Sequence, residues 1–315
     1  MNAKEPLVLN LEQGESAAHL AASGNTLAIG TSYRGLYDRS KSVAEQSQCL
    51  VVLVRDGSPP IRTPLKPGAM RSLVGMPTGF LAGRVVYDHE GRTVTQVFEV
   101  DLKGGVTEMP SLPIDLAGLW AGKDGDVFAY GARDVFRWSA ANPVWEKLPL
   151  DPAADAEAIR KIVTLKDGLS LVVTDRVLKG FKSLQKPPIF TDDLKTYPET
   201  IWAYGEDEWW IVTTSDDTQK LSRIGPAGQV QGIAPLGRVN VTNVLFRGNQ
   251  LVVICSGRWD DAHRCFYYLL DRDGAGSLRG PFDLPNDTMN ACVWKDSIVT
   301  GNSVMTRVYK TPIEP

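Results

Sequence analysis

Residues 295–312 read KDSIVTGNSVMTRVYKTP, a polar turn followed by two strand-like segments, SIVTG and VMTRVYK. Together with the segment that precedes Lys295, SIVTG and VMTRVYK make a module of three strands. The other modules of the chain have the same order of turn and strands but continue into a fourth strand. Residues 6–11, PLVLNL, form an apolar strand-like segment ahead of the first full pattern. An open sheet edge is a hazard for a β protein. We therefore expect residues 6–11 to supply the strand that the last module lacks.

Seven polar turns recur along the chain, and each is followed by an apolar segment rich in β-branched and aromatic residues. The turns are centred on Gly24, Thr78, Asp124, Asp167, Glu206, Gly248 and the Lys295–Asp296 pair. Gly, Asn and Asp suit these places because hairpin turns need positive φ. Successive turns are separated by roughly 40 to 54 residues, which is the spacing expected for one four-stranded blade.

In these features the chain resembles the β-propellers as an architecture, over its whole length. It carries neither the Gly-His and Trp-Asp pairs of WD40 repeats nor the double glycine of kelch repeats, so no specific family is identified. The resemblance implies one all-β domain over residues 1–315, a seven-bladed propeller closed by the N-terminal strand. We expect blades at about residues 16–65, 69–110, 114–150, 157–192, 197–234, 237–283 and 286–312, the last completed by residues 6–11. A pair of β-sandwiches is the alternative.

Composition excludes several classes of protein. The 34 basic and 37 acidic residues give a formal charge of -3, which argues against nucleic-acid binding. No apolar stretch is long enough to span a bilayer, and residues 1–15 lack the features of a signal peptide. Four cysteines, without a CxxC pair, lie in apolar runs typical of buried thiols. We expect a cytoplasmic monomer, with Cys255 and Cys265 near enough in the sequence to pair if oxidised.

The sequence holds few catalytic motifs. GxSxG, GxGxxG and P-loop patterns are absent. The three histidines, His19, His89 and His263, fall in different modules, and a lone histidine is more often structural than a ligand. We expect no cofactor and no metal, and no catalytic residue is assigned.

Charged residues near the starts of the innermost strands form one candidate site. Aligning the modules on their turns brings a set of them to one mouth of the central channel: Glu15, Arg71, Asp115, Arg160 and Glu199. Carboxylates at a suitable separation can perform acid–base or nucleophilic work. The alternative is a wet channel mouth that collects charges without chemistry.

Two longer connections between second and third strands form the other candidate site. Residues 31–48 and 256–264 contain residue types enriched at binding hot spots, together with acidic neighbours. The predicted partner-binding residues are Tyr33, Arg34, Tyr37, Asp38, Arg39, Arg258, Trp259, Asp260 and Asp261. In a closed ring the two loops would rise on one face, two blades apart. A hairpin extension that packs only on itself is the alternative.

The sequence therefore favours a binding protein over an enzyme. We expect a propeller that captures another protein through these loops, and more narrowly a bacterial adaptor or toxin-neutralising (immunity) protein. A carbohydrate- or lactone-acting hydrolase that uses the channel-mouth carboxylates is the alternative. The identity of a partner or ligand and the source organism cannot be read from these residues.

Overall fold

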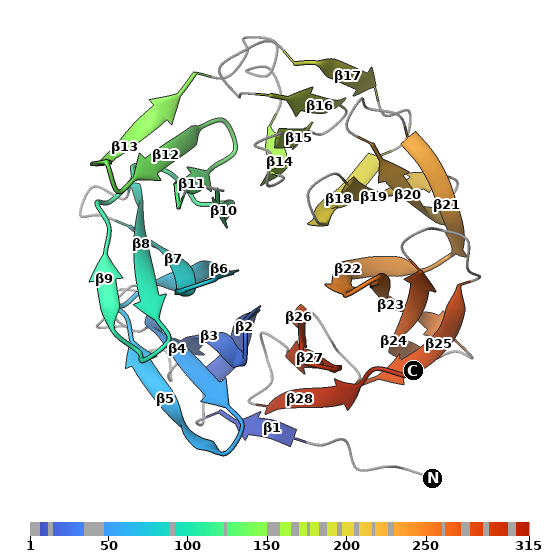
Figure 1. Cartoon of the computed structure of the whole chain (residues 1–315), viewed down its shortest axis with the longest axis horizontal. Helices are drawn as coiled ribbons and strands as arrows, with labels where there is room; N and C mark the ends of the chain where they lie inside the picture. The colour runs from blue at the N-terminus through green and yellow to red at the C-terminus, as the bar shows by residue number, and fades with distance from the viewer. Residues whose placement is uncertain are drawn as a thin grey trace. The chain divides into compact units, whose positions relative to one another are not determined.

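Seven four-stranded sheets make up the described part of the computed structural model (Figure 1). The fold is an all-β seven-bladed β-propeller, so the predicted fold class is confirmed. The described residues are 7–11, 15–34, 47–87, 92–122, 125–149, 158–164, 170–174, 177–182, 188–193, 197–204, 208–215, 218–225, 230–259, 262–271, 278–285, 290–301 and 307–314. The chain divides into two compact units: Met1–Leu116, Arg264–Phe266 and Phe282–Pro315 form one, and Ala117–His263 and Tyr267–Pro281 form the other.

The first unit contains the first, second and seventh blades. The first blade holds β2 (Glu15–Ser23), β3 (Thr26–Arg34), β4 (Ser47–Arg55) and β5 (Ser58–Pro64). The second holds β6 (Ala69–Met76), β7 (Gly79–Tyr87), β8 (Thr93–Asp101) and β9 (Val106–Glu108). The seventh holds β26 (Asn290–Trp294), β27 (Ser297–Gly301), β28 (Arg307–Pro312) and β1 (Leu7–Asn10).

The remaining blades belong wholly or mainly to the second unit. The third holds β10 (Gly118–Ala121), β11 (Val127–Tyr130), β12 (Val135–Ser139) and β13 (Asn142–Leu148). The fourth holds β14 (Ile159–Thr164), β15 (Ser170–Thr174), β16 (Val177–Phe181) and β17 (Phe190–Asp193). The fifth holds β18 (Tyr197–Tyr204), β19 (Glu208–Ser215), β20 (Thr218–Ile224) and β21 (Val230–Gly237), and the sixth holds β22 (Asn240–Arg247), β23 (Gln250–Trp259), β24 (Ala262–Asp271) and β25 (Arg279–Leu284).

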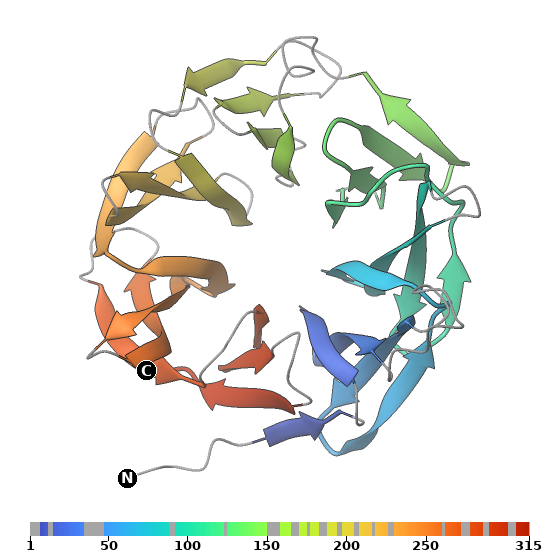
Figure 2. The same cartoon turned by 180° about the vertical axis from the view of Figure 1, so that it is seen from behind.

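The seventh blade is completed by the strand from the other end of the chain. β1 pairs antiparallel with β28, with Leu9 opposite Val308 and Asn10 opposite Arg307. The sheet order is β1-β28-β27-β26, and β1 lies beside β28 in both views (Figure 2). Leu11 follows β1 directly and is 6% exposed. The prediction that the N-terminal strand completes the C-terminal blade is confirmed.

Neighbouring blades pack through apolar side chains from both faces of their sheets. On β3, Leu27 and Ile29 join a core cluster shared with the seventh blade, whereas Ala28 joins one shared with the second. Because alternate residues of a strand point to opposite faces, a strand packed on both sides reads as a continuous apolar run. This double burial explains the run TLAIG at residues 26–30.

Within each unit, innermost strands of neighbouring blades lie close together. In the first unit β2 contacts both β26 and β6, and in the second unit β14 contacts both β10 and β18. The backbones of β6 and β2 come close at Gly75, where a Cβ atom would lie 2.3 Å from the carbonyl oxygen of Ala22 on β2. Glycine is required at this position because any side chain would collide with that backbone.

Candidate functional site

The β3–β4 hairpin of the first blade carries part of the predicted binding surface. Tyr33 pairs with Gln48 on β4 and with Glu15, the first residue of β2. Arg34 pairs with Ser47, one step beyond the start of β2. The backbones of Tyr33 and Arg34 therefore lie at the end of the hairpin that leads into residues 35–46. The other predicted residues of this loop, Tyr37, Asp38 and Arg39, lie outside the described residues.

The β23–β24 hairpin of the sixth blade extends beyond its innermost strand. β22 begins at Asn240, which pairs with Ser256, whereas β23 continues to Trp259. β24 begins at Ala262, so the expectation of a loop over residues 256–264 is wrong for most of that segment. Antiparallel strands joined by a short connection can continue to pair after a third strand ends, which explains the difference.

This hairpin places two of the predicted binding residues on a strand. The backbones of Arg258 and Trp259 are the last two positions of β23. Asp260 and Asp261, which connect the two strands, lie outside the described residues.

A second set of residues, most of them polar, lies at β-bulges on the innermost strands. In the described part of the chain, five of these strands skip one residue in their pairing with the next strand, near the same position. The skipped residues are Ala18 in β2, Arg71 in β6, Arg160 in β14, Glu199 in β18 and Thr242 in β22. Three of them belong to the predicted channel-mouth set. Bulges redirect side chains and are over-represented beside active sites.

The bulge in β14 decides which side chains enter the core. Ile159 and Ile162 are three residues apart, yet they are 4% and 3% exposed and belong to the same core cluster. A regular strand would place them on opposite faces. Because the extra residue shifts the alternation, both face the core, and neither Arg160 nor Lys161 belongs to that cluster. The sequence pattern apolar–polar–polar–apolar is the feature from which this arrangement could have been inferred.

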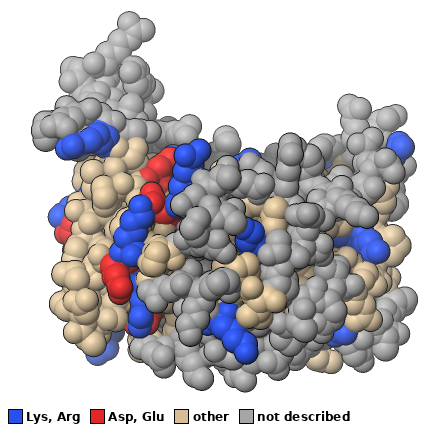
Figure 3. All heavy atoms as spheres, turned by 90° about the horizontal axis from the view of Figure 1, so that it is seen from above, with Lys and Arg blue, Asp and Glu red and all other residues tan. Residues whose placement is uncertain are grey.

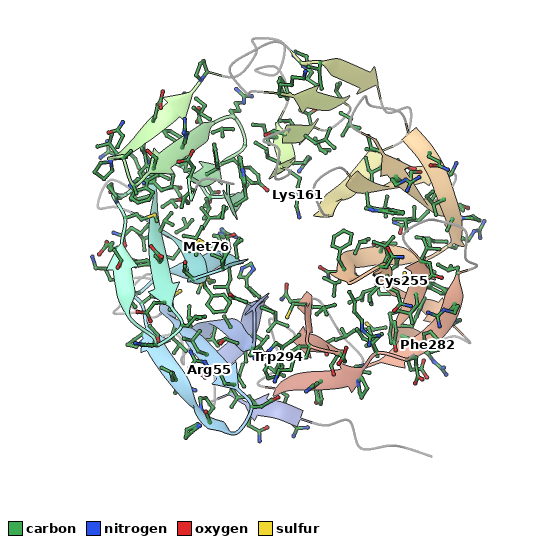
Figure 4. The ribbon with its side chains drawn as sticks, in the orientation of Figure 1. Arg55, Met76, Lys161, Cys255, Phe282 and Trp294 are labelled. Carbon is green, nitrogen blue, oxygen red and sulfur yellow. The ribbon has the colours of Figure 1, made fainter. Side chains whose placement is uncertain are left out.

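Lys161 is the residue at this bulge with the clearest electrostatic perturbation. It is partly buried, and burial lowers the pKa of its ammonium group. Burial is the one cause of the shift, and no carboxylate within the described segments pairs with Nζ. Figure 4 shows its side chain extending from β14 on the side away from β15. Perturbed ionisable groups without a structural partner are candidates for function.

His19 follows the bulged residue of β2 and faces β6. Its Nε2 lies 3.4 Å from the carbonyl oxygen of Met70. Burial lowers the pKa of the imidazole, the contact with Met70 opposes that shift, and the charge of Arg71 adds to it. The lowered pKa favours the neutral imidazole, and the side chain of Arg71 is exposed.

The predicted carboxylates have different surroundings. Glu15 is 3% exposed and forms an ion pair with Arg62, on the outermost strand of the same blade. Asp115 is exposed between β9 and β10. The side chain of Glu199 lies outside the described residues. Where side chains are described, no three His, Cys, Asp or Glu residues gather closely enough to hold a metal ion.

Arg84 is a buried cation that the sequence analysis did not single out. It lies on β7, is 4% exposed, and donates from Nη2 to the Oε1 atom of Gln96. Its guanidinium carbon lies 5.7 Å from the ring centroid of Phe98, and its Nε has no acceptor in the described structure. Burial lowers the pKa of this group. A charged residue within the apolar run FLAGRVVY was the available indication of its burial.

Figure 3 shows acidic and basic side chains interleaved at the left of the drawn face, and the described charged side chains elsewhere on it are basic. In the third blade, Arg137 pairs with Asp126 at 2.6 Å and Lys147 pairs with Asp134 at 2.6 Å.

Two further observations concern the four cysteines and the length of apolar helices. Cys49, Cys255, Cys265 and Cys292 are all buried and none of them forms a disulfide in this structure. None of the described segments is an apolar helix of membrane-spanning length.

Comparison with known proteins supports the fold without identifying a family. No protein-family model and no curated protein matches the chain. Virginiamycin B lyase from Staphylococcus aureus matches with a TM-score of 0.61 and 12% identity, over 97% of this chain and 98% of that one. The β-propeller domain of the Trilobed protease from Pyrococcus furiosus matches with a TM-score of 0.66 and 10% identity, over 96% and 97%.

A third similar structure is a chain of the Mitotic Checkpoint Complex, with a TM-score of 0.62 and 10% identity over 100% of this chain and 99% of that one. The structural neighbours thus include enzymes and proteins of larger assemblies. At these identities the likeness extends to the propeller fold alone.

Proposed function

We propose that this propeller binds another protein through its two extended hairpins, β23–β24 and β3–β4. The proposal rests on the length of β23. The first residue of β22 pairs with Ser256, but β23 continues past that point to Trp259. Three backbone positions thereby project past the innermost strand. They include Arg258 and Trp259, two of the residue types that dominate binding hot spots.

Hairpin ends on a rigid scaffold are a common basis for recognition. Strands held by neighbouring sheets fix the position of the loop, so little conformational entropy is lost when a partner binds. More narrowly, we propose that the protein is an adaptor or a toxin-neutralising (immunity) protein, since such proteins would use a surface of this kind.

The test is affinity capture from native lysate, followed by mass spectrometry and by titration of any captured protein. The variant Tyr37→Ala/Arg258→Ala/Trp259→Ala should weaken binding at least about 100-fold, because hot-spot residues cost about 2 kcal/mol or more each when truncated. Its melting temperature should stay near that of the parent protein, since Arg258 and Trp259 are the last two positions of β23.

A matched control replaces residue types of the same kind elsewhere on the surface. Arg133→Ala/Val144→Ala changes an exposed arginine and a 55% exposed apolar side chain in the third blade. This variant should retain full binding. Unchanged affinity in the triple variant, or equal loss in the control, contradicts the proposed surface.

The bulged innermost strands favour a second candidate, a carbohydrate- or lactone-acting hydrolase. Arg71 and Arg160 occupy bulges of the kind found beside active sites. Turnover of a glycoside or lactone panel, abolished by Asp115→Asn or by Glu199→Gln, would support this candidate. If no substrate in the panel is turned over, this candidate is rejected.

A further inference from the structure

Arg84 lies between the first and second blades, within the first unit. On the same strand, β7, Phe80 and Ala82 belong to the core cluster that the second blade shares with the first. Because alternate residues of a strand share a face and β7 pairs regularly with β8 through Arg84 and Gln96, Arg84 faces the first blade as well. It is 4% exposed. A permanently charged guanidinium is therefore buried between two blades.

The guanidinium makes few polar contacts for a buried cation. Nη2 donates to Oε1 of Gln96, and the guanidinium carbon lies 5.7 Å from the ring centroid of Phe98. Nε is buried and finds no acceptor among the described residues. Nη1 lies against the linker of residues 65–68 that joins the two blades, since a Cβ atom on Gly68 would be 2.8 Å from it. In the described segments, one neutral acceptor thus serves a group with five N–H donors.

The described groups near Arg84 do not neutralise its charge directly. Burial raises the pKa of the Cys49 thiol, on β4 of the first blade, to about 12, and the charge of Arg84 opposes that shift. The thiol is therefore neutral at pH 7. Glu108 is near enough for its charge to act on Arg84, but its Oε2 atom pairs with Nζ of Lys66 at 2.5 Å. A buried charge is costly unless it is paired.

We propose that Arg84 binds a chloride ion between the first and second blades, with Nε as the principal donor. Chloride meets both requirements of the guanidinium, because it accepts a hydrogen bond from Nε and neutralises the positive charge. A water molecule would meet only the first. The 4% exposure of Arg84 favours a small monovalent anion, since a multiply charged one such as phosphate would be more costly to desolvate.

The first test is the melting temperature of the intact chain in sodium chloride and sodium gluconate, mixed at constant ionic strength. An ion that binds only the folded state stabilises it in a saturable way. Chloride at about ten times its dissociation constant should therefore raise the melting temperature by roughly 2–4 °C. General salt effects change steadily with concentration, so saturation distinguishes the two. Equal melting temperatures in the two salts, or a change without saturation, overturn the proposal.

Bromide can locate the ion in the parent protein. Crystals grown in sodium bromide should give an anomalous peak within hydrogen-bonding distance of Nε of Arg84, at the halide concentration that saturates the melting curve. A water molecule or a protein acceptor at Nε, without such a peak, overturns the proposal. A peak that appears only at molar bromide is an adventitious ion only and also overturns it. This measurement decides the matter even if a variant fails to fold.

Two variants separate ion binding from the packing of the arginine side chain. Arg84→Gln should lose the saturable response to chloride. If the arginine had only a packing role, the same variant would melt lower by an equal amount in both salts and leave any response to chloride in place. Arg92→Gln is the matched control, because it changes an exposed arginine of the same blade and should keep the full response. Capture by the hairpins is measured separately, so either proposal can fail alone.

Discussion

Replacing Leu11 by alanine should destabilise the first unit as a whole, because this side chain joins two blades. Leu11 is 6% exposed and belongs to the core cluster that also contains Leu27 of the first blade and Trp294 and Val308 of the seventh. Leu→Ala substitutions at such sites cost about 2–5 kcal/mol, depending on how far the cavity collapses. Leu11 lies just past a terminal strand that can shift, so we expect the lower part of that range, about 2–3 kcal/mol.

Urea unfolding followed by both tryptophan fluorescence and far-ultraviolet circular dichroism measures this effect. With a slope of roughly 4 kcal/mol/M for a chain of this size, the midpoint should fall by about 0.5–0.8 M. Val144→Ala, at a 55% exposed position, is the control and should change stability by less than about 0.5 kcal/mol.

Deletion of residues 1–11 should have a larger effect than Leu11→Ala. It also removes the pairing of β1 with β28 and the packing of Leu9, and it exposes the edge of β28. An exposed edge strand promotes association, so the deleted protein should form dimers or larger species in analytical ultracentrifugation. An unchanged main transition, with only a small early step attributable to a fraying tail, would refute this account of closure.

Two further predictions concern single residues. Burial lowers the pKa of Lys161 in the folded state, so the folded protein binds fewer protons than the unfolded chain between that lowered pKa and about 10.4. Stability should therefore rise with pH across this window, and Lys161→Met should raise stability at pH 7 and remove that part of the slope in urea titrations. Gly75→Ala should cost about 1–3 kcal/mol in the same assay, because its Cβ would lie 2.3 Å from the carbonyl oxygen of Ala22. An unaltered pH slope in Lys161→Met would contradict the first prediction, and an unaltered urea midpoint in Gly75→Ala would contradict the second.

The sequence predicted the fold because its strongest features are local. Glycine, asparagine and aspartate at the turns reflect backbone conformations that few residues adopt. Continuous apolar runs such as TLAIG reflect burial on both faces of a sheet. The pairing of β1 with β28 joins distant parts of the chain, yet it could be predicted, because each end of the pattern was incomplete in a way that the other could complete.

The bulges were harder to predict, because they depend on pairing with the neighbouring strand. Ile159 and Ile162, separated by Arg160 and Lys161, have a spacing that suits one face of a helix as well as a bulged strand. The hairpin of β23 and β24 was read as a loop for a related reason. Glycine and aspartate suggest a turn, and only the pairing reveals that the strands continue to Trp259 and from Ala262.

The bulge recurs in five innermost strands of the described part of the chain, but the residues at the bulge differ from blade to blade. In β14 and β22 an apolar residue on each side of the bulge is buried, and the polar pair between them is less buried. The pairs differ from blade to blade: Ala18–His19, Arg71–Ser72, Arg160–Lys161, Glu199–Thr200 and Thr242–Asn243. The backbone feature is kept while the side chains change, so the bulge itself does not require Arg160 or Lys161. A partly buried lysine without a described anionic partner costs stability, whereas the corresponding positions of the other bulges hold histidine, serine, threonine and asparagine.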